Sequence, residues 1–347
     1  MKIFYILLVF SCQVLGQDKS ILFYLDEDLK PLLQFSKDND QNYTMGLGFG
    51  YASQNLNGSM IFRGIEFIDH KTLPARFTNS DVSLQASLTL NGTAFTPNDL
   101  RAGTIIKEDR PYAFLLYTSL KKQYLHNREY IATELNIGIL GLDLGRWVQT
   151  NIHEALNKND TQEPYTPRGW QHQISKGGEP TLLYAVNYNK LLEQKSFFDL
   201  KYGAQAMLGY YTNVNIEIAG RFGILDKNNW TRNYTPLGTG NKNRMLSMKG
   251  VKKRKAEAFL FVSIKPSVVL YNQMLNGGIR KSAHTLSWNE TNHFVLEWNS
   301  GIGTTIPTAN ANSLEVIWVV NSGRTSEINT PLARSHQWGG IYLSYNF

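Results

Sequence analysis

The sequence predicts an all-β protein, a closed antiparallel transmembrane β-barrel of about 12 strands, and three observations lead to this prediction. Long segments alternate small or polar residues with apolar or aromatic ones, as strands do when one face meets lipid and the other a lumen. The number of such segments is even, which suits a closed barrel without an unpaired edge. The last segment places Ile341, Leu343, Tyr345 and Phe347 on one face, and such an aromatic terminus is typical of outer-membrane barrels.

Composition and hydropathy exclude two other classes. The longest uninterrupted apolar run is Ile3–Phe10, whereas a membrane-spanning helix needs about 20 residues. Aromatic residues make up 12% of the chain, whereas disordered chains contain few aromatics. A helical membrane protein and a disordered chain are therefore both excluded.

The first residues predict a secretory signal peptide over 1–16. Lys2 supplies a positive start, Ile3–Phe10 an apolar centre, and the small residue Gly16 a cleavage point. Residues 17–347 are then the barrel.

Cleavage at this point would also remove Cys12, the single cysteine, so we invoke no disulfide or thiolate site. The formal net charge of +7 would become +6 with the loss of Lys2. A secreted, basic chain suits anionic lipid, and we expect no nucleic-acid partner.

The alternating pattern runs through nearly the whole chain. Tyr43, Met45 and Leu47 alternate with small or polar neighbours, and Asn215 and Glu217 occupy the polar face of a later segment. The expected strands are near 20–28, 43–53, 82–95, 111–122, 129–140, 180–191, 197–210, 213–224, 256–271, 293–305, 313–322 and 338–347.

Loop positions follow from placing both termini in the periplasm, as in other barrels of this kind. The expected extracellular loops are near 29–42, 96–110, 141–179, 211–213, 272–292 and 323–337. Two expected periplasmic connections, 54–81 and 225–255, are long by the rule of short inner turns. Small plugs and docking segments are both open interpretations of them.

The longest extracellular loop, 141–179, begins with a predicted short helix. Val148, Ile152 and Ala155 fall on one face at helical spacing, and Gln149 and His153 share a neighbouring face. An amphipathic helix at the outer rim would lie at the level of lipid headgroups. His153 would then meet lipid where the acyl esters begin.

Several short motifs together resemble the lipid A 3′-O-deacylase family of twelve-stranded outer-membrane barrels. The pair D-x-N-Y-T-x-G and D-R-P-Y-A is specific, and the likeness covers most of residues 20–200; the later half resembles the family mainly in its strand pattern. The motifs are Asp40–Gly46, Gly92–Asp99, Lys107–Ala113, Gln149 with His153, Gly169–Gln173 and Glu179-Pro180.

This resemblance implies an esterase that removes the 3′-linked acyloxyacyl chain of lipid A on the extracellular side. In the family a His activates water, assisted by a Thr, a Lys and a metal-binding acidic pair. Matched by motif, these residues are His153, Thr44 and Lys107. The acidic pair departs from the family's Asn-Asp, with Glu27 at the Asn position and Asp28 at the Asp position.

The metal implied is a divalent cation, and calcium suits clustered carboxylate oxygens. Strand alternation places Glu27 on the face opposite to Asp26 and Asp28. We therefore rank Asp28 as the metal ligand, with Asp26 as the residue that could share the cation and Glu27 assisting.

Other interpretations remain open beside the deacylase. One alternative is a non-catalytic barrel, either a pore or a structural protein. Another is a phospholipid esterase of the same mechanism. A serine nucleophile has no support, because the sequence contains no G-x-S-x-G motif. We interpret Trp170 as an interfacial aromatic and His172 as a loop residue.

We expect the protein to be a monomer whose partners are lipid A or lipopolysaccharide of the outer leaflet and membrane lipid. Glu134, Lys201, Glu217, Arg221 and Glu297 are expected to form an ion network in the lumen.

Overall fold

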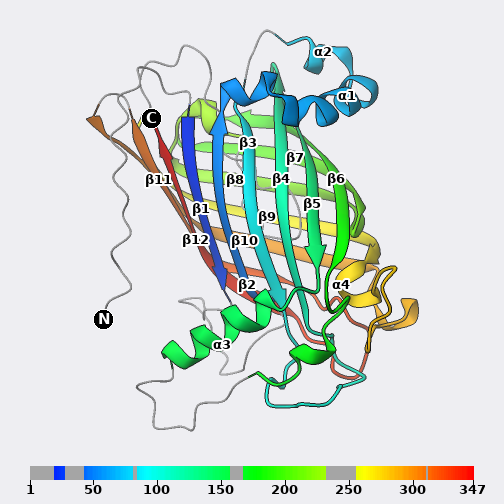
Figure 1. Ribbon diagram of the computed structural model, residues 1–347. Helices are drawn as coiled ribbons and strands as arrows, with labels where there is room; N and C mark the ends of the chain where they lie inside the picture. The colour runs from blue at the N-terminus through cyan, green and yellow to red at the C-terminus, as the bar shows by residue number, and fades with distance from the viewer. Residues whose placement is uncertain (1–18, 28–42, 81–83, 157–166, 232–254, 310–311) are drawn as a thin grey trace.

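The computed structural model describes residues 19–27, 43–80, 84–156, 167–231, 255–309 and 312–347. Twelve antiparallel strands, each bonded to its neighbours in sequence order, close into a barrel (Figure 1). The predicted all-β, twelve-stranded closed barrel is confirmed. The strands are β1 Lys19–Glu27, β2 Tyr43–Ser53, β3 Ala86–Phe95, β4 Ala113–His126, β5 Glu129–Leu140, β6 Glu179–Gln194, β7 Phe198–Gly209, β8 Tyr211–Ile224, β9 Glu257–Asn272, β10 Phe294–Pro307, β11 Ser313–Arg324 and β12 His336–Asn346.

Short helices lie at both ends of the barrel (Figure 1). Among the described residues, no helix has the length and apolar character needed to cross a membrane. One end, here called the α3 end, carries α3 (Leu144–Leu156), η4 (Trp170–His172), α4 (Gln273–Asn276) and η6 (Trp288–Glu290). The opposite end, the α1 end, carries η1 (Gln54–Gly58), η2 (Met60–Phe62), α1 (Arg63–Thr72), α2 (Ala75–Thr78) and η5 (Lys227–Asn229). The predicted helix of the third loop corresponds to α3.

Alternation along each strand gives the barrel an apolar outer wall and a polar lumen. In β8, Ile216 and Ile218 are exposed on the outside, whereas the intervening Asn215 and Glu217 are buried inside. The same alternation repeats in β6, β7 and β9. An outer wall of this kind is the surface that lipid covers in transmembrane barrels.

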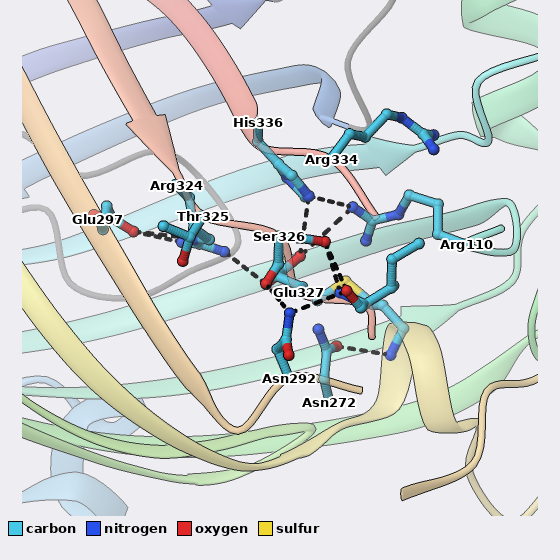
Figure 2. A network of polar contacts seen from close by, with 12 residues as sticks. Arg110, Asn272, Asn292, Glu297, Arg324, Thr325, Ser326, Glu327, Arg334 and His336 are labelled. Atoms are coloured by element: carbon cyan, nitrogen blue, oxygen red, sulfur yellow. Dashed lines mark hydrogen bonds and ion pairs between the residues drawn. The ribbon is translucent and has the colours of Figure 1, made fainter. Parts of the chain in front are cut away.

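Buried ion pairs connect neighbouring strands on the lumenal side of the barrel. Arg221 of β8 pairs with Asp199 of β7 and, at 3.3 Å, with Glu257 of β9. Glu297 of β10 pairs with Lys265 at 2.6 Å and also with Arg324 of β11 (Figure 2). The expected lumenal network is thus present as separate clusters, because Arg221 and Glu297 bind different partners.

The seam between β1 and β12 closes the ring. The register runs from Ser20 opposite Asn346 to Glu27 opposite Gly339. Beyond it, the backbone amide of Lys19 donates to the carbonyl of Phe347 at 3.2 Å, and the amide of Phe347 donates back at 3.0 Å. The last residue therefore takes part in closing the barrel.

Deleting Phe347 should lower the yield of closed barrel, because two seam hydrogen bonds, each worth about 1 kcal/mol net, are lost. The yield is measured as the fraction of protein that migrates in a folded, heat-sensitive form in detergent electrophoresis. Ser335→Ala, an exposed loop substitution, is the control and should leave the yield unchanged. Equal yields for both variants would show that the terminal pair does not contribute to closure.

Candidate active site

Four of the candidate residues from the sequence lie at the α3 end of the barrel, on β1, β2, the loop between β3 and β4, and α3. Glu27 ends β1, and Thr44 is the second residue of β2. Lys107 is exposed in the loop between β3 and β4, and His153 is in the last turn of α3. Asp28, and the side chains of Glu27 and His153, lie outside the described residues.

Helix α3 packs against the outer wall of the barrel, not over the lumen. Val148 contacts a buried cluster that includes Met45, Ala94 and Phe114, which are outward-facing residues of β2, β3 and β4. A Cβ atom at Gly145 would lie 2.6 Å from Cβ of Phe114, so only glycine allows the helix to approach this closely. The first turns of α3, which precede His153, therefore lie against the outer wall.

Trp170 holds α3 in place. Its indole is 1% exposed, and Nε1 donates a hydrogen bond to Oε1 of Gln149 at 2.7 Å. Its ring centre lies 4.9 Å from that of Tyr112, and a Cβ at the preceding Gly169 would come within 2.2 Å of the Tyr112 ring. The interpretation of Trp170 as an interfacial aromatic is wrong, because the protein itself buries the indole. Gln149, the hydrogen-bond acceptor, precedes His153 by one helical turn.

A β-bulge sets the position of Thr44. The pairing of β2 with β3 shifts between Tyr43 and Met45, so Thr44 is the extra residue. As a result, Tyr43 faces the lumen, where its hydroxyl donates to Oδ2 of Asp26 at 3.1 Å, while Met45 faces the outer wall. Oγ1 of Thr44 lies 2.7 Å from Oγ1 of Thr96, just after β3. The two hydroxyls form a polar pair beside the wall covered by α3.

Asp109 organises the loop that contains Lys107. Its carboxylate, which is fully buried, accepts hydrogen bonds from the backbone amides of Asn98 at 2.8 Å and Arg110 at 2.7 Å. It also pairs with Arg334, from the loop before β12, at 2.8 Å. The two sequence motifs at the ends of this loop are thus joined through one side chain.

Two further loops contact the same segment. Nε2 of His284 lies 2.9 Å from the carbonyl oxygen of Asp109, and the hydroxyl of Thr330 donates to the carbonyl of Glu108 at 2.6 Å. The turn around Lys107 is therefore held by the β9–β10 and β11–β12 loops.

Arg110 extends this contact into the barrel (Figure 2). Its guanidinium is 1% exposed, lies 3.5 Å from the carboxylate of Glu327 and 3.5 Å from Nε2 of His336, and stacks on Phe95. Burial lowers the pKa of Arg110 to about 10, against the attraction of Glu327, so the side chain stays charged at neutral pH. In the sequence Arg110 belongs only to the D-R-P-Y-A motif, and its contacts could not be predicted because Glu327 and His336 lie near the far end of the chain.

The acidic residues of β1 differ in what they face. Asp26 is fully buried and faces the lumen, where Tyr43 binds it, so it is separated from α3 by the barrel wall. The next residue, Glu27, pairs through its backbone with Met45 on the neighbouring strand. Among the described residues, no group of three or more His, Cys, Asp or Glu side chains gathers as a metal site would require.

A closed barrel with an apolar outer wall, a polar lumen and a helix packed on the wall at its rim defines a transmembrane protein of the outer membrane. A family model described as Outer membrane protein LpxR matches residues 3–347, and the chain belongs to this family. The membership confirms the family that the motifs of the first half indicate.

Among solved structures, one match supports this fold, and two further matches are weaker. LpxR from Salmonella typhimurium aligns with a TM-score of 0.69 at 17% identity, over 94% of this chain and 100% of that chain. The β-domain of the Bordetella autotransporter BrkA gives a TM-score of 0.41 at 8% identity, over 95% and 97% of the two chains. The P. putida toluene transporter TodX gives 0.33 at 9% identity, over 96% and 91%. No significant match was found among curated proteins.

Replacing Asp109 with alanine should loosen the loop that carries Lys107. Three hydrogen bonds would be lost, and the backbone amides of Asn98 and Arg110 would lose their acceptor, at a cost of about 1–3 kcal/mol. Amide hydrogen exchange in residues 96–112 should rise by at least tenfold while the barrel strands keep their protection.

The matched control is Asp99→Ala in the same loop, since Asp99 is exposed and accepts one local bond, from the amide of Arg101. Its exchange should change little. Unchanged exchange in the Asp109→Ala protein would show that other contacts order this loop.

Proposed function

We propose that the protein is an esterase that removes the 3′-linked acyloxyacyl chain of lipid A at the outer rim of the barrel. The single observation that supports this most is the packing of α3 against the outer wall, where partly buried Val148 and buried Trp170 contact a cluster of outward-facing strand residues. A site there is open to a lipid diffusing in the membrane plane and closed to a solute in the lumen. The α3 end would then face the cell exterior, where lipid A is found.

The mechanism we propose begins with water activation. His153 takes a proton from a water molecule, and the resulting hydroxide attacks the carbonyl carbon of the acyl ester. Negative charge develops on the carbonyl oxygen, and the ammonium group of Lys107 stabilises it. The hydroxyl of Thr44, already paired with Thr96, is available to hydrogen-bond the substrate or the attacking water. Return of the proton from His153 to the leaving alkoxide releases the fatty acid and the sugar hydroxyl.

The oxygen donors at this rim suit a hard divalent cation such as calcium. The Thr44–Thr96 hydroxyl pair is next to the end of β1, which contributes Glu27 and is followed by Asp28. Such a cation would polarise the ester carbonyl. Strand alternation, with Asp26 in the lumen, favours the outward side for Glu27. Asp28 comes after the last residue of β1, so alternation within the strand does not fix its side, and we propose Asp28 as a ligand together with Glu27.

Exposed cations at the α3 end favour a phosphorylated lipid as substrate. These side chains surround the rim near α3 and the β3–β4 loop, and they suit the phosphates of lipid A. They are Arg101, Lys107, Arg146, Arg168, Lys176 and Lys281.

The two alternatives predict different products. Mass spectrometry of lipid A from cells with and without the gene should show loss of a 3′ acyloxyacyl group only when the gene is present. Unchanged lipid A together with released lysophospholipid would instead indicate a phospholipid esterase. Unchanged lipid A without released lysophospholipid would support a non-catalytic barrel, although the buried ion pairs of the lumen do not favour a pore.

Replacing His153 with alanine should lower the rate of deacylation by roughly 10²–10⁴-fold, because the general base is lost. The rate is measured as release of the 3′ chain from purified lipid A in detergent, with folded protein selected by its heat-sensitive migration. His172→Ala is the matched control, since His172 lies in the same loop, and it should keep most of the rate. Near-full turnover by folded His153→Ala would assign the base to another residue.

Removing divalent cations with a chelator should abolish the deacylase rate, and added calcium should restore it. Glu27→Gln and Asp28→Asn should each raise the calcium concentration needed for half-maximal rescue, because each removes a charged ligand. Full activity in chelator would leave Lys107 as the sole source of charge stabilisation and would contradict the metal proposal.

A further inference from the structure

The segment containing α1 lies on the outside of the barrel, at the α1 end, as Figure 1 shows. Phe62 and Ile65 are fully buried against Ala86 and Leu120, with Leu135 at the edge of the cluster. These strand residues alternate with lumenal ones and therefore face outward. The interpretation of residues 54–81 as a plug is therefore wrong for the part that the structure describes. This part is bound to the outer wall of the barrel.

Polar contacts fix α1 to the wall. The buried carboxylate of Asp69 accepts hydrogen bonds from the hydroxyls of Tyr124 at 2.6 Å, Thr133 at 2.8 Å and Tyr184 at 2.8 Å. Each of the three donors is on an outward-facing strand position. One helical turn earlier, Glu66 pairs with Lys122 of β4 at 2.5 Å.

A polar part of the outer wall lies under this helix. Leu135 pairs with Tyr184 beneath the segment, and the next outward pair toward the α3 end is Ile137 with Leu182. Ile137 and Leu182 are 53% and 58% exposed, so the lipid-facing wall begins directly beside α1.

The segment exposes three large apolar side chains on the side turned away from the barrel. Met60, Ile61 and Phe67 are 77%, 52% and 67% exposed. Arg63 and Lys71 are exposed in the same helix. An apolar face flanked by cations, continuous with a lipid-facing wall, is the pattern of helices that lie in the plane of a bilayer surface.

We propose that residues 60–72 are an in-plane membrane anchor that binds the phospholipid leaflet at the α1 end. Phe67, Ile61 and Met60 insert among the acyl chains, and Arg63 and Lys71 bind the phosphate groups of anionic phospholipids. The helix replaces lipid over a stretch of wall that is too polar for acyl chains and restores an apolar surface outside it. The proposal rests on the barrel and is independent of the proposed deacylase activity.

Site-directed spin labelling tests where Phe67 lies. The full chain carrying Cys12→Ser and Phe67→Cys is labelled with a nitroxide and reconstituted in vesicles of phosphatidylcholine with one-third phosphatidylglycerol. Collisions with oxygen should exceed collisions with a water-soluble nickel chelate by several-fold, placing the label just below the phosphates. A label at Asn228→Cys in η5, at the same end and exposed, is the control and should show the reverse preference.

Two results would overturn the anchor. One is a Phe67 label as accessible to the nickel chelate as the Asn228 label. The other is spin–spin broadening between Phe67 labels, which would show that a second copy of the chain covers this face instead of lipid.

A second experiment tests the anionic headgroups. Spin-labelled phosphatidylglycerol should be enriched over phosphatidylcholine in the motionally restricted lipid around the folded protein. Arg63→Gln with Lys71→Gln should reduce this preference by about fivefold for each charge at the affected sites. Lys227→Gln, in η5, is the control and should leave it unchanged. An unaltered preference in the double variant would contradict binding of anionic lipid by this helix.

Discussion

Closure of the backbone hydrogen bonding between β1 and β12 is the constraint on which the rest of the molecule depends. With no free edge, each strand residue faces either the lumen or the outer wall, and the pattern of the chain assigns it to one or the other. The lumen receives charges that must be paired, such as Arg221 and Glu297. The wall receives apolar residues and, at its two ends, helices α1 and α3.

Both helices use the wall as a support, but they are attached differently. α3 approaches through Gly145 and is held by the buried indole of Trp170, so its contact is one of close apolar packing. α1 is attached through the carboxylate of Asp69 and three strand hydroxyls, with apolar residues beside them. A helix packed on glycine and tryptophan has little freedom to shift, which suits the placement of a reacting group. A helix attached by several hydrogen bonds and an ion pair to strand residues suits the anchoring role proposed for α1.

The sequence predicted the strands well because alternation is a local property. The strand expected over 43–53 is β2, Tyr43–Ser53, without a shift. The position of α1 could not be predicted in this way, since Tyr124 and Tyr184 fit an ordinary strand pattern and their partner lies outside the barrel. The motifs located Lys107, but not the ion pair between Asp109 and Arg334, whose residues are 225 positions apart. Only the fold brings such loops together.

The bulge in β2 has a consequence for how residue 44 can vary. Inserting one residue between Tyr43 and Met45 reverses the phase of the strand, which sends the tyrosine hydroxyl inward to Asp26 and the methionine outward to α3. The side chain of residue 44 therefore determines the contact with Thr96, whereas the presence of a residue at this position determines which way Tyr43 and Met45 face. A substitution alters the polar pair with Thr96 alone, whereas a one-residue deletion would turn Tyr43 toward lipid and leave Asp26 without its hydrogen-bond donor. The bulge therefore fixes the number of residues at this position, whereas the role proposed for the Thr44 hydroxyl fixes the type of side chain.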